Sequence, residues 1–295
     1  MQRASLTLAA ILVALTGSAI GGPGATPPAP VIAPHDVYDL LRSGNQRWAA
    51  DNAEHRNVGS ERRSDTAQHG QHPFACIITC ADSRIPVERV FDRGVGDLFV
   101  VRVAGNVASP AVLGSVEYAV DHLATPVVIV MGHTSCGAVA AACSDAELHG
   151  NVATLIESIR PVVKDAKASV AGEKPSKKDE TAQATIVAEA VRLNVEHQVR
   201  ASVEQSPVIA QAVADGRTRI VGAIYDLESG QVRWLDEQPG LRDLAMRTLA
   251  PKQEPEVAQT EEKKPVRRAT PAAAAPAKNA ASPRRVTTAL DREPH

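Results

Sequence analysis

The sequence is poor in aromatic residues, in cysteine and in net charge. Its 295 residues include three Phe, three Tyr and two Trp, which argues against a surface that stacks nucleic-acid bases on aromatic rings. Four cysteines are too few to form the disulfide framework of a chain this long. A formal net charge of −2 provides no global attraction to nucleic acid or to anionic lipid. We therefore expect no nucleic-acid partner.

The amino-terminal segment differs in composition from the central part of the chain. Arg3 precedes an apolar run at residues 6–15, and small residues occupy positions 17–19. A positive start, a short apolar run and a small-residue exit are typical of a secretory signal peptide, here residues 1–19. The apolar run is short for a membrane span, which needs about 20 residues. We predict an exported, periplasmic protein, with a membrane anchor formed by an uncleaved signal as the alternative.

Two further segments are predicted to lie outside the folded core. Residues 20–34 are rich in Pro and Gly, which indicates an extended linker. Residues 251–295 are rich in Pro and Ala and have few large apolar side chains, so we expect a disordered tail. Seven Lys or Arg and no acid lie between residues 263 and 285, which favours a solvated linker or a weak contact with an anionic envelope surface. Residues 35–250 remain, enough for one α/β domain.

Short apolar runs rich in β-branched residues predict the strands of this domain. Near-continuous apolar strands are typical of parallel sheets covered on both faces. Segments 111–123 and 181–204 show helical spacing, and a turn at 228–230 predicts an antiparallel edge strand at 232–235. A short closing helix is expected at 241–249. The predicted fold is α/β, a mostly parallel central sheet flanked by helices. Its four parallel strands are expected at 74–79, 98–103, 127–131 and 219–225.

Chemically reactive side chains come after two of these predicted strands. Cys80, Asp82 and Arg84 come directly after the first strand, and His133 and Cys136 come after the third. Because ligands of open parallel sheets bind beyond the carboxyl ends of the strands, we expect both motifs to lie together. Two thiolates and one imidazole suit Zn²⁺ in tetrahedral coordination. Three protein ligands leave a fourth position open, which is typical of a catalytic zinc site.

The other cysteines and a disulfide are alternatives for this cluster. Cys76 lies four residues before Cys80, about 13 Å away at the rise of a strand, which is too far to share a metal. Cys143 lies seven residues after Cys136, roughly 10 Å along a helix. We expect Cys76 and Cys143 to be buried small hydrophobes. A disulfide between Cys80 and Cys136 stays open, since export implies an oxidising compartment.

The spacing of Asp82 and Arg84 predicts an ion pair beside Cys80. A bidentate pair with arginine fixes the orientation of a carboxylate and lowers its pKa. Next to a metal, such a carboxylate accepts a hydrogen bond from bound hydroxide or fills the fourth position itself. The alternative is an exposed ion pair worth under about 1 kcal/mol. Adjacency to Cys80 favours the functional role.

These segments resemble the signature motifs of the β-class carbonic anhydrases. The two signature segments are Cys80–Arg84 (CADSR) and Gly132–Gly137 (GHTSCG). Further matching segments lie at 40–48, 96–106 and 222–230, and the resemblance covers about residues 35–237. It implies reversible hydration of CO₂ to bicarbonate and a proton, through hydroxide bound to one zinc per subunit. Hydrolysis of CS₂ or COS on the same scaffold, or a non-catalytic zinc-binding envelope protein, are the alternatives.

The resemblance also implies roles for individual residues. Zinc ligands are Cys80, His133 and Cys136, and the Asp82–Arg84 pair gates the fourth position.

In the substrate site, the resemblance implies that Gln71 hydrogen-bonds substrate, in this family often across a dimer interface. Phe99 matches an apolar wall of the CO₂ pocket, and the backbone N–H of Gly137 is expected near the site. The family forms dimers, commonly paired into tetramers, so we expect a homodimer or tetramer. Residues 36–52 would be the helical arm that wraps on the partner.

The sequence departs from the family pattern in two places. Residues 77–79 are Ile-Ile-Thr, where one subgroup has a Trp-x-Gly that binds bicarbonate as an inhibitor, so that inhibitory site is not expected. Val103 replaces the polar amide of a frequent Arg-Asn-Ala-Gly-Asn segment.

Overall fold

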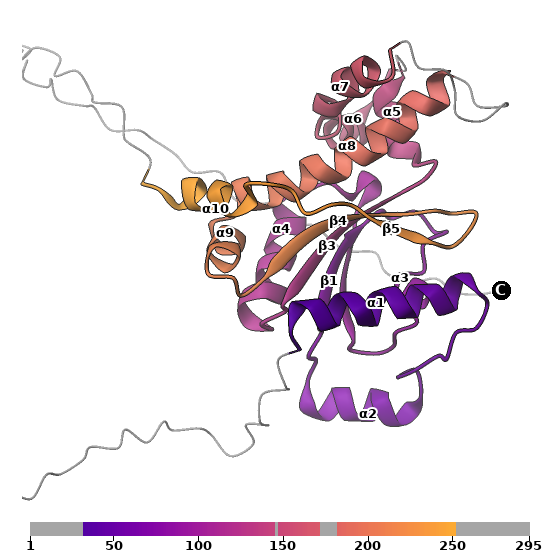
Figure 1. Ribbon diagram of the computed structural model, residues 1–295, viewed down its shortest axis with the longest axis vertical. Coiled ribbons are helices and arrows are strands. Elements are labelled where there is room, and N and C mark those ends of the chain that lie inside the picture. Colours follow the sequence, from indigo (N-terminus) through magenta and orange to yellow (C-terminus); the bar gives the residue numbers. More distant parts are fainter. Residues whose placement is uncertain (1–31, 145–146, 172–181, 252–295) are drawn as a thin grey trace, which may run out of the picture. The chain divides into compact units, whose positions relative to one another are not determined.

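The computed structural model of the chain describes residues 32–144, 147–171 and 182–251. The predicted signal peptide, most of the predicted linker and nearly all of the predicted tail lie outside these ranges. Five strands form one sheet in the order β2-β1-β3-β4-β5 (Figure 1). They are β1 (Ala75–Thr79), β2 (Leu98–Arg102), β3 (Val127–His133), β4 (Arg219–Tyr225) and β5 (Val232–Trp234).

The sheet has the predicted topology. Strands β1 to β4 are parallel, and β5 pairs with β4 in the antiparallel direction. β1 and β3 are buried along their whole length, which explains why their sequences are almost continuously apolar. β2 forms one edge, and most of its residues are half-buried. The expected α/β fold is thus confirmed, while β3 runs two residues further than predicted and includes His133.

Helices pack around this sheet, which lies between α1 and α8 in the view of Figure 1. The helices predicted at 181–204 and 241–249 are found as α8 and α10, and the segment 111–123 forms α4 and then a π-helical turn, η2. The longer helices are α1 (Pro34–Ala49), α2 (Ser60–His69), α4 (Pro110–Glu117), α6 (Gly150–Glu157), α7 (Pro161–Ser169), α8 (Ala182–Gln205), α9 (Pro207–Ala214) and α10 (Leu241–Leu249). The shorter ones are α3 (Val87–Val90), η1 (Ala104–Asn106), η2 (Tyr118–His122) and α5 (Gly137–Cys143).

Two glycines let α8 approach the sheet closely. A Cβ atom added to Gly132 on β3 would lie 2.6 Å from Cγ2 of Val195 on α8. A Cβ atom added to Gly222 on β4 would lie 2.8 Å from Cγ1 of the same valine. Contacts this short would force a displacement, so the two glycines allow α8 to lie this close to β3 and β4.

The two amino-terminal helices differ in burial. α1 buries Val37 and Leu41, and its Asn45 donates to the carbonyl of Gly230 (2.8 Å) and accepts from the N–H of Val232 (2.8 Å). The predicted arm is therefore anchored on its own domain, and its contact with a partner stays a prediction. α2, which lies wholly within the described ranges, has no buried residue. None of the helices that the structure describes combines the length and apolarity of a bilayer span.

Candidate metal centre

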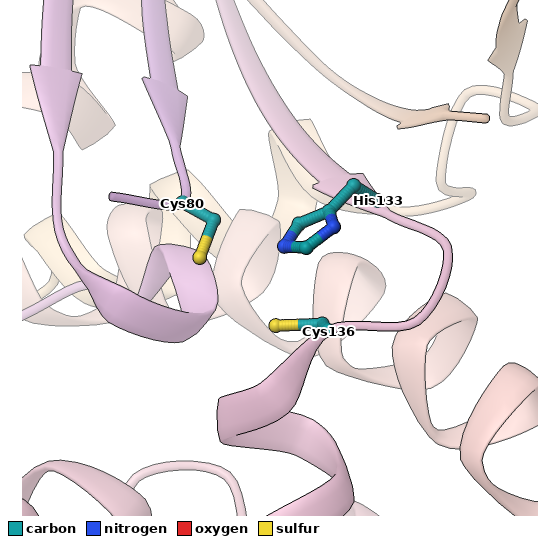
Figure 2. Close-up of side chains that lie close together, drawn as sticks. All are labelled: Cys80, His133 and Cys136. Carbon is teal, nitrogen blue, oxygen red and sulfur yellow. The ribbon is translucent and has the colours of Figure 1, made fainter. Parts of the chain in front are cut away.

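The two predicted motifs meet at the carboxyl edge of the sheet. β1 and β3 are neighbours in parallel register, with Thr79 opposite Met131, and the Thr79 hydroxyl donates to the Met131 carbonyl at 2.9 Å. Cys80 comes directly after β1, His133 ends β3 and Cys136 precedes α5. Their ligand atoms lie within 4.8 Å of one another, and all three side chains are buried. Figure 2 shows both sulfur atoms and one ring nitrogen of His133 pointing toward a common centre.

The imidazole of His133 is oriented as a metal ligand. Its Nδ1 lies 2.9 Å from the carbonyl oxygen of Thr134, and because a carbonyl only accepts, Nδ1 carries the proton. Nε2 then has a free lone pair. It is buried and has no hydrogen-bond partner among the described residues. A buried unpaired acceptor is unfavourable by about 1–3 kcal/mol, and a metal ion at the centre of the cluster would satisfy it.

The two sulfur atoms favour a bound cation. Within the described residues all four cysteines are free thiols, so the alternative disulfide between Cys80 and Cys136 is not found. The hydrogen bond from Cys136 holds the pKa of Cys80 well below its usual range, against the effect of burial. The same contact, together with burial, raises the pKa of Cys136. The backbone N–H of Gly105 also donates to the sulfur of Cys80 at 3.3 Å. Two sulfurs and one imidazole are a donor set that fits Zn²⁺.

The predicted ion pair is present beside the cluster. Nε of Arg84 donates to Oδ1 of Asp82 at 2.9 Å, and its Nη2 donates to Oδ2 at 2.7 Å. These bonds hold the pKa of Asp82 well below its usual range, so the carboxylate stays ionised. Oδ2 lies 3.9 Å from Nε2 of His133, which places a negative charge next to the centre of the cluster.

The structure adds Arg102 to the site, a residue that sequence reasoning placed only in a matching segment. Arg102 ends β2, opposite Thr79. Its Nε donates to the carbonyl of Cys80 at 3.1 Å, and its Nη2 donates to the carbonyl of Asp82 at 2.5 Å. One guanidinium therefore holds the backbone that carries both a candidate ligand and the carboxylate. The sequence did not reveal this role because it does not give the strand order, and only the pairing of β1 with β2 brings Arg102 beside Cys80.

The prediction for the other two cysteines agrees with the structure. Cys76 lies within β1 and Cys143 ends α5, and both are buried and outside the cluster. Burial raises the pKa of Cys76 to about 12 and also raises that of Cys143. Gly137, whose backbone N–H is expected near the site, comes directly after Cys136 and begins α5.

Gln71 and Phe99 lie elsewhere in the chain. Gln71 is exposed and precedes the amino end of β1, whereas the cluster lies at its carboxyl end. Phe99 pairs with Cys76, three residues before the Thr79–Arg102 pair, which is about 10 Å along the strand. Gln71 and Tyr118 line one surface pocket, and the Phe99 ring lies 6.2 Å from that of Tyr118. Within the described part of one chain, these two residues do not reach the cluster.

The comparisons with known proteins agree on one family. Residues 75–232 match the family model described as carbonic anhydrase. The chain is 38% identical to "Carbonic anhydrase 2" of Mycobacterium tuberculosis over 204 residues, 67% of this chain and 91% of that protein.

Solved structures give the same result. The fold is similar to the β-carbonic anhydrase CafA of Aspergillus fumigatus, with a TM-score of 0.56 and 28% identity over 72% of this chain and 97% of that one. It is also similar to one of two tetrameric β-carbonic anhydrases from Sordaria macrospora, with a TM-score of 0.50 and 28% identity over 68% and 97% of the two chains.

Proposed function

The chain belongs to the β-class carbonic anhydrases, and from this membership we propose how its own residues serve the reaction. The protein is a zinc-dependent enzyme that converts CO₂ and water to bicarbonate and a proton, reversibly. One observation assigns the reaction to this site. Nε2 of His133 is buried, has no hydrogen-bond partner among the described residues and lies beside the sulfur atoms of two cysteines.

Cys80, His133 and Cys136 are the residues that would hold the zinc ion. Bound there, Zn²⁺ acts as a Lewis acid that makes a nucleophile available from water near neutral pH. Three protein donors leave room for that water, which is what separates this set from a closed structural site.

Asp82 is the group that orients the reacting water. Arg84 occupies both carboxylate oxygens from one side and keeps them ionised, so Asp82 acts as a hydrogen-bond acceptor rather than as an acid. An acceptor fixed in this way holds the O–H of the water and turns a lone pair toward the CO₂ carbon. Arg102 keeps the backbone of Asp82 in place while this happens.

A second copy of the chain completes the substrate site in this proposal. Gln71 and Phe99, the predicted substrate-binding residues, lie away from the cluster of their own chain. Exposed apolar side chains, Val95 and Tyr118, lie around Gln71. An assembly in which this surface covers the cluster of a partner would supply both an apolar wall and a polar contact for CO₂. We propose a homodimer as the minimal active unit and a pair of such dimers as the larger assembly; the similar β-carbonic anhydrases from Sordaria macrospora are tetrameric.

Export is the second part of the proposal. It is supported by the positive start, short apolar run and small-residue exit of residues 1–19. The mature enzyme would then act in the periplasm, or at the membrane if the signal is not cleaved. The basic residues between 263 and 285 would give the tail a weak affinity for an anionic envelope surface.

The first experiment is stopped-flow CO₂ hydration by the zinc-loaded full-length chain, with zinc content measured on the same sample. A rate that rises through one titration between about pH 6.5 and 9, the range that brackets the pKa of water on catalytic zinc, supports the proposed site. Stoichiometric zinc without any hydration at any pH would contradict it, and CS₂ and COS would then be tested as substrates.

A further inference from the structure

A stripe of polar side chains lies buried on the sheet-facing side of α8. Asn194, Gln198 and Ser202 succeed one another at intervals of four residues, on the same side as Val195 and Val199. All three polar residues are almost completely buried. Buried amides are unfavourable unless they are hydrogen-bonded, so their presence in an otherwise apolar interface requires a structural reason.

Two of these side chains hold the segment after β2. Nδ2 of Asn194 donates to the carbonyl oxygen of Gly105 at 3.0 Å. Oε1 of Gln198 accepts the N–H of Ala108 at 2.8 Å, and its Nε2 donates to Oδ1 of Asn194 at 3.0 Å. The pair therefore clamps the segment at both ends, and Gln198 fixes which way the amide of Asn194 faces.

Gly105 connects this clamp to the metal centre. Its N–H donates to the sulfur of Cys80 at 3.3 Å, while its carbonyl is the group that Asn194 holds. The backbone of Gly105 is left-handed, with φ at +71°, and an added Cβ atom would lie 2.5 Å from Cδ1 of Ile159. A glycine adopts this conformation without penalty but does not by itself maintain it. The hydrogen bond from Asn194 supplies that constraint.

The same face of α8 also sets the position of a second candidate ligand. Val195, next to Asn194 in the sequence, packs on Gly132, and Gly132 directly precedes His133. α8 contributes none of the three side chains of the cluster, yet it contacts the segments that position two of them.

We propose that Asn194, supported by Gln198, is a positioning residue of the metal centre that holds the Gly105 N–H on the sulfur of Cys80. This inference rests on the proposed function, because it takes Cys80 to be a zinc ligand. A hydrogen bond to a ligating sulfur withdraws electron density from it and fixes its orientation before the metal arrives. Such outer contacts change metal affinity by about 10- to 100-fold when they are removed.

The test compares wild-type protein with Asn194→Ala and with a matched control, Ser202→Ala. Ser202 is buried on the same stripe, but its hydroxyl donates only to the carbonyl of Gln198 within α8. We expect Asn194→Ala to raise the dissociation constant for zinc about 10- to 100-fold in a chelator competition. When both proteins are loaded with cobalt in place of zinc, the sulfur-to-cobalt charge-transfer band of Asn194→Ala should lie at longer wavelength than that of wild type, because the sulfur of Cys80 has lost a hydrogen bond. Ser202→Ala should change neither quantity.

A wild-type measurement keeps the proposal testable even if Asn194→Ala does not fold. In protein loaded with NMR-active cadmium, the Gly105 amide proton should show scalar coupling to the metal through the N–H···S bond. Absence of that coupling overturns the proposal, as does an Asn194→Ala protein with wild-type zinc affinity and band position. Equal changes in Ser202→Ala would also overturn it, since they would reflect a loosened core. Failure of the proposed function is separate, because it is measured on wild-type protein, which would then bind no zinc or would bind zinc without hydrating CO₂.

Discussion

Oδ2 of Asp82 lies 3.9 Å from Nε2 of His133, although the two residues are 51 positions apart in the sequence. The carboxylate belongs to the segment after β1 and the imidazole to the end of β3. A species bound to Nε2 would be within reach of a carboxylate that Arg84 already holds in one orientation. Substitutions at this site should therefore separate metal binding from the orientation of the reacting water.

Replacing Asp82 should remove the orientation of the reacting water without removing the metal. We expect Asp82→Asn to lower kcat/KM for CO₂ hydration by about 100-fold, at the lower end of what one positioned proton-handling group contributes. Zinc content should stay at one per subunit. Asp215→Asn is the matched control, because Asp215 and Arg217 have the same spacing and also form an ion pair, at 3.3 Å and away from the cluster. An Asp82→Asn enzyme with full activity would rule out this role.

Removing a candidate ligand should remove the metal. We expect His133→Ala and Cys136→Ser to bind less than one zinc per subunit and to have no measurable CO₂ hydration, since two donors do not retain Zn²⁺ against exchange with solvent. Elemental analysis after gel filtration measures the zinc. Cys143→Ala is the control, because Cys143 is buried but lies outside the cluster, and it should keep both zinc and activity. Zinc retained by His133→Ala would point to a different ligand set.

Gln71 should act on the cluster of a partner rather than on its own. Gln71→Ala and Cys136→Ser homodimers are each expected to be impaired, the first in KM and the second in zinc binding. Mixed dimers combine the intact cluster of one subunit with the intact Gln71 of the other. Subunit exchange should therefore restore CO₂ hydration above the mean of the two parent proteins. If Gln71 served its own cluster, the mixed dimers would show no such gain.

Asp92 should make the domain sensitive to acid. The carboxylate is almost fully buried, and burial alone would raise its pKa. The N–H groups of Glu54 and His55 and the guanidinium of Arg47 outweigh burial, so the pKa lies below its usual value. A lowered folded-state pKa gives stability that is present above the unfolded pKa of about 3.9 and is lost as the pH falls through the folded value.

The corresponding variant is Asp92→Asn. It should reduce the free energy of unfolding at pH 7 by about 1.5–3 kcal/mol, the range for a hydrogen bond to a charged group. Urea denaturation at pH 7 and at pH 3 measures the free energy of unfolding of both proteins, and the difference between wild type and Asp92→Asn should be smaller at pH 3. A difference that is equal at both pH values would contradict the assignment. Asp36→Asn, at an exposed contact with His35, should have little effect at either pH.

The metal cluster could be predicted from the sequence because its geometry depends on sheet topology alone. Two apolar runs predict parallel strands, and Cys80 and His133 stand at their carboxyl ends, so the residues must meet if the strands are neighbours. Arg102 could not be assigned in the same way, because its role depends on β2 being the other neighbour of β1.

Other features leave no periodic signal in the sequence. α2 has no apolar face, so hydrophobic spacing does not reveal it. Asn194 and Gln198 have the spacing of an ordinary polar helix face, and only the packing of α8 in the folded domain shows that this face is buried and bonded to Gly105. The locations of Gln71 and Phe99 relative to a cluster depend on a second chain, which the pattern of one sequence does not encode.

The separation of Cys80 and His133 along the chain has a consequence for the lifetime of the protein. A ligand that holds both residues joins two points of the chain that are far apart in the unfolded state, and it binds the native arrangement of β1 and β3 in preference to any other. By mass action, free zinc then shifts the balance away from unfolded chains. The supply of zinc in the compartment would control how long each molecule survives proteolysis, in addition to how fast it turns over CO₂.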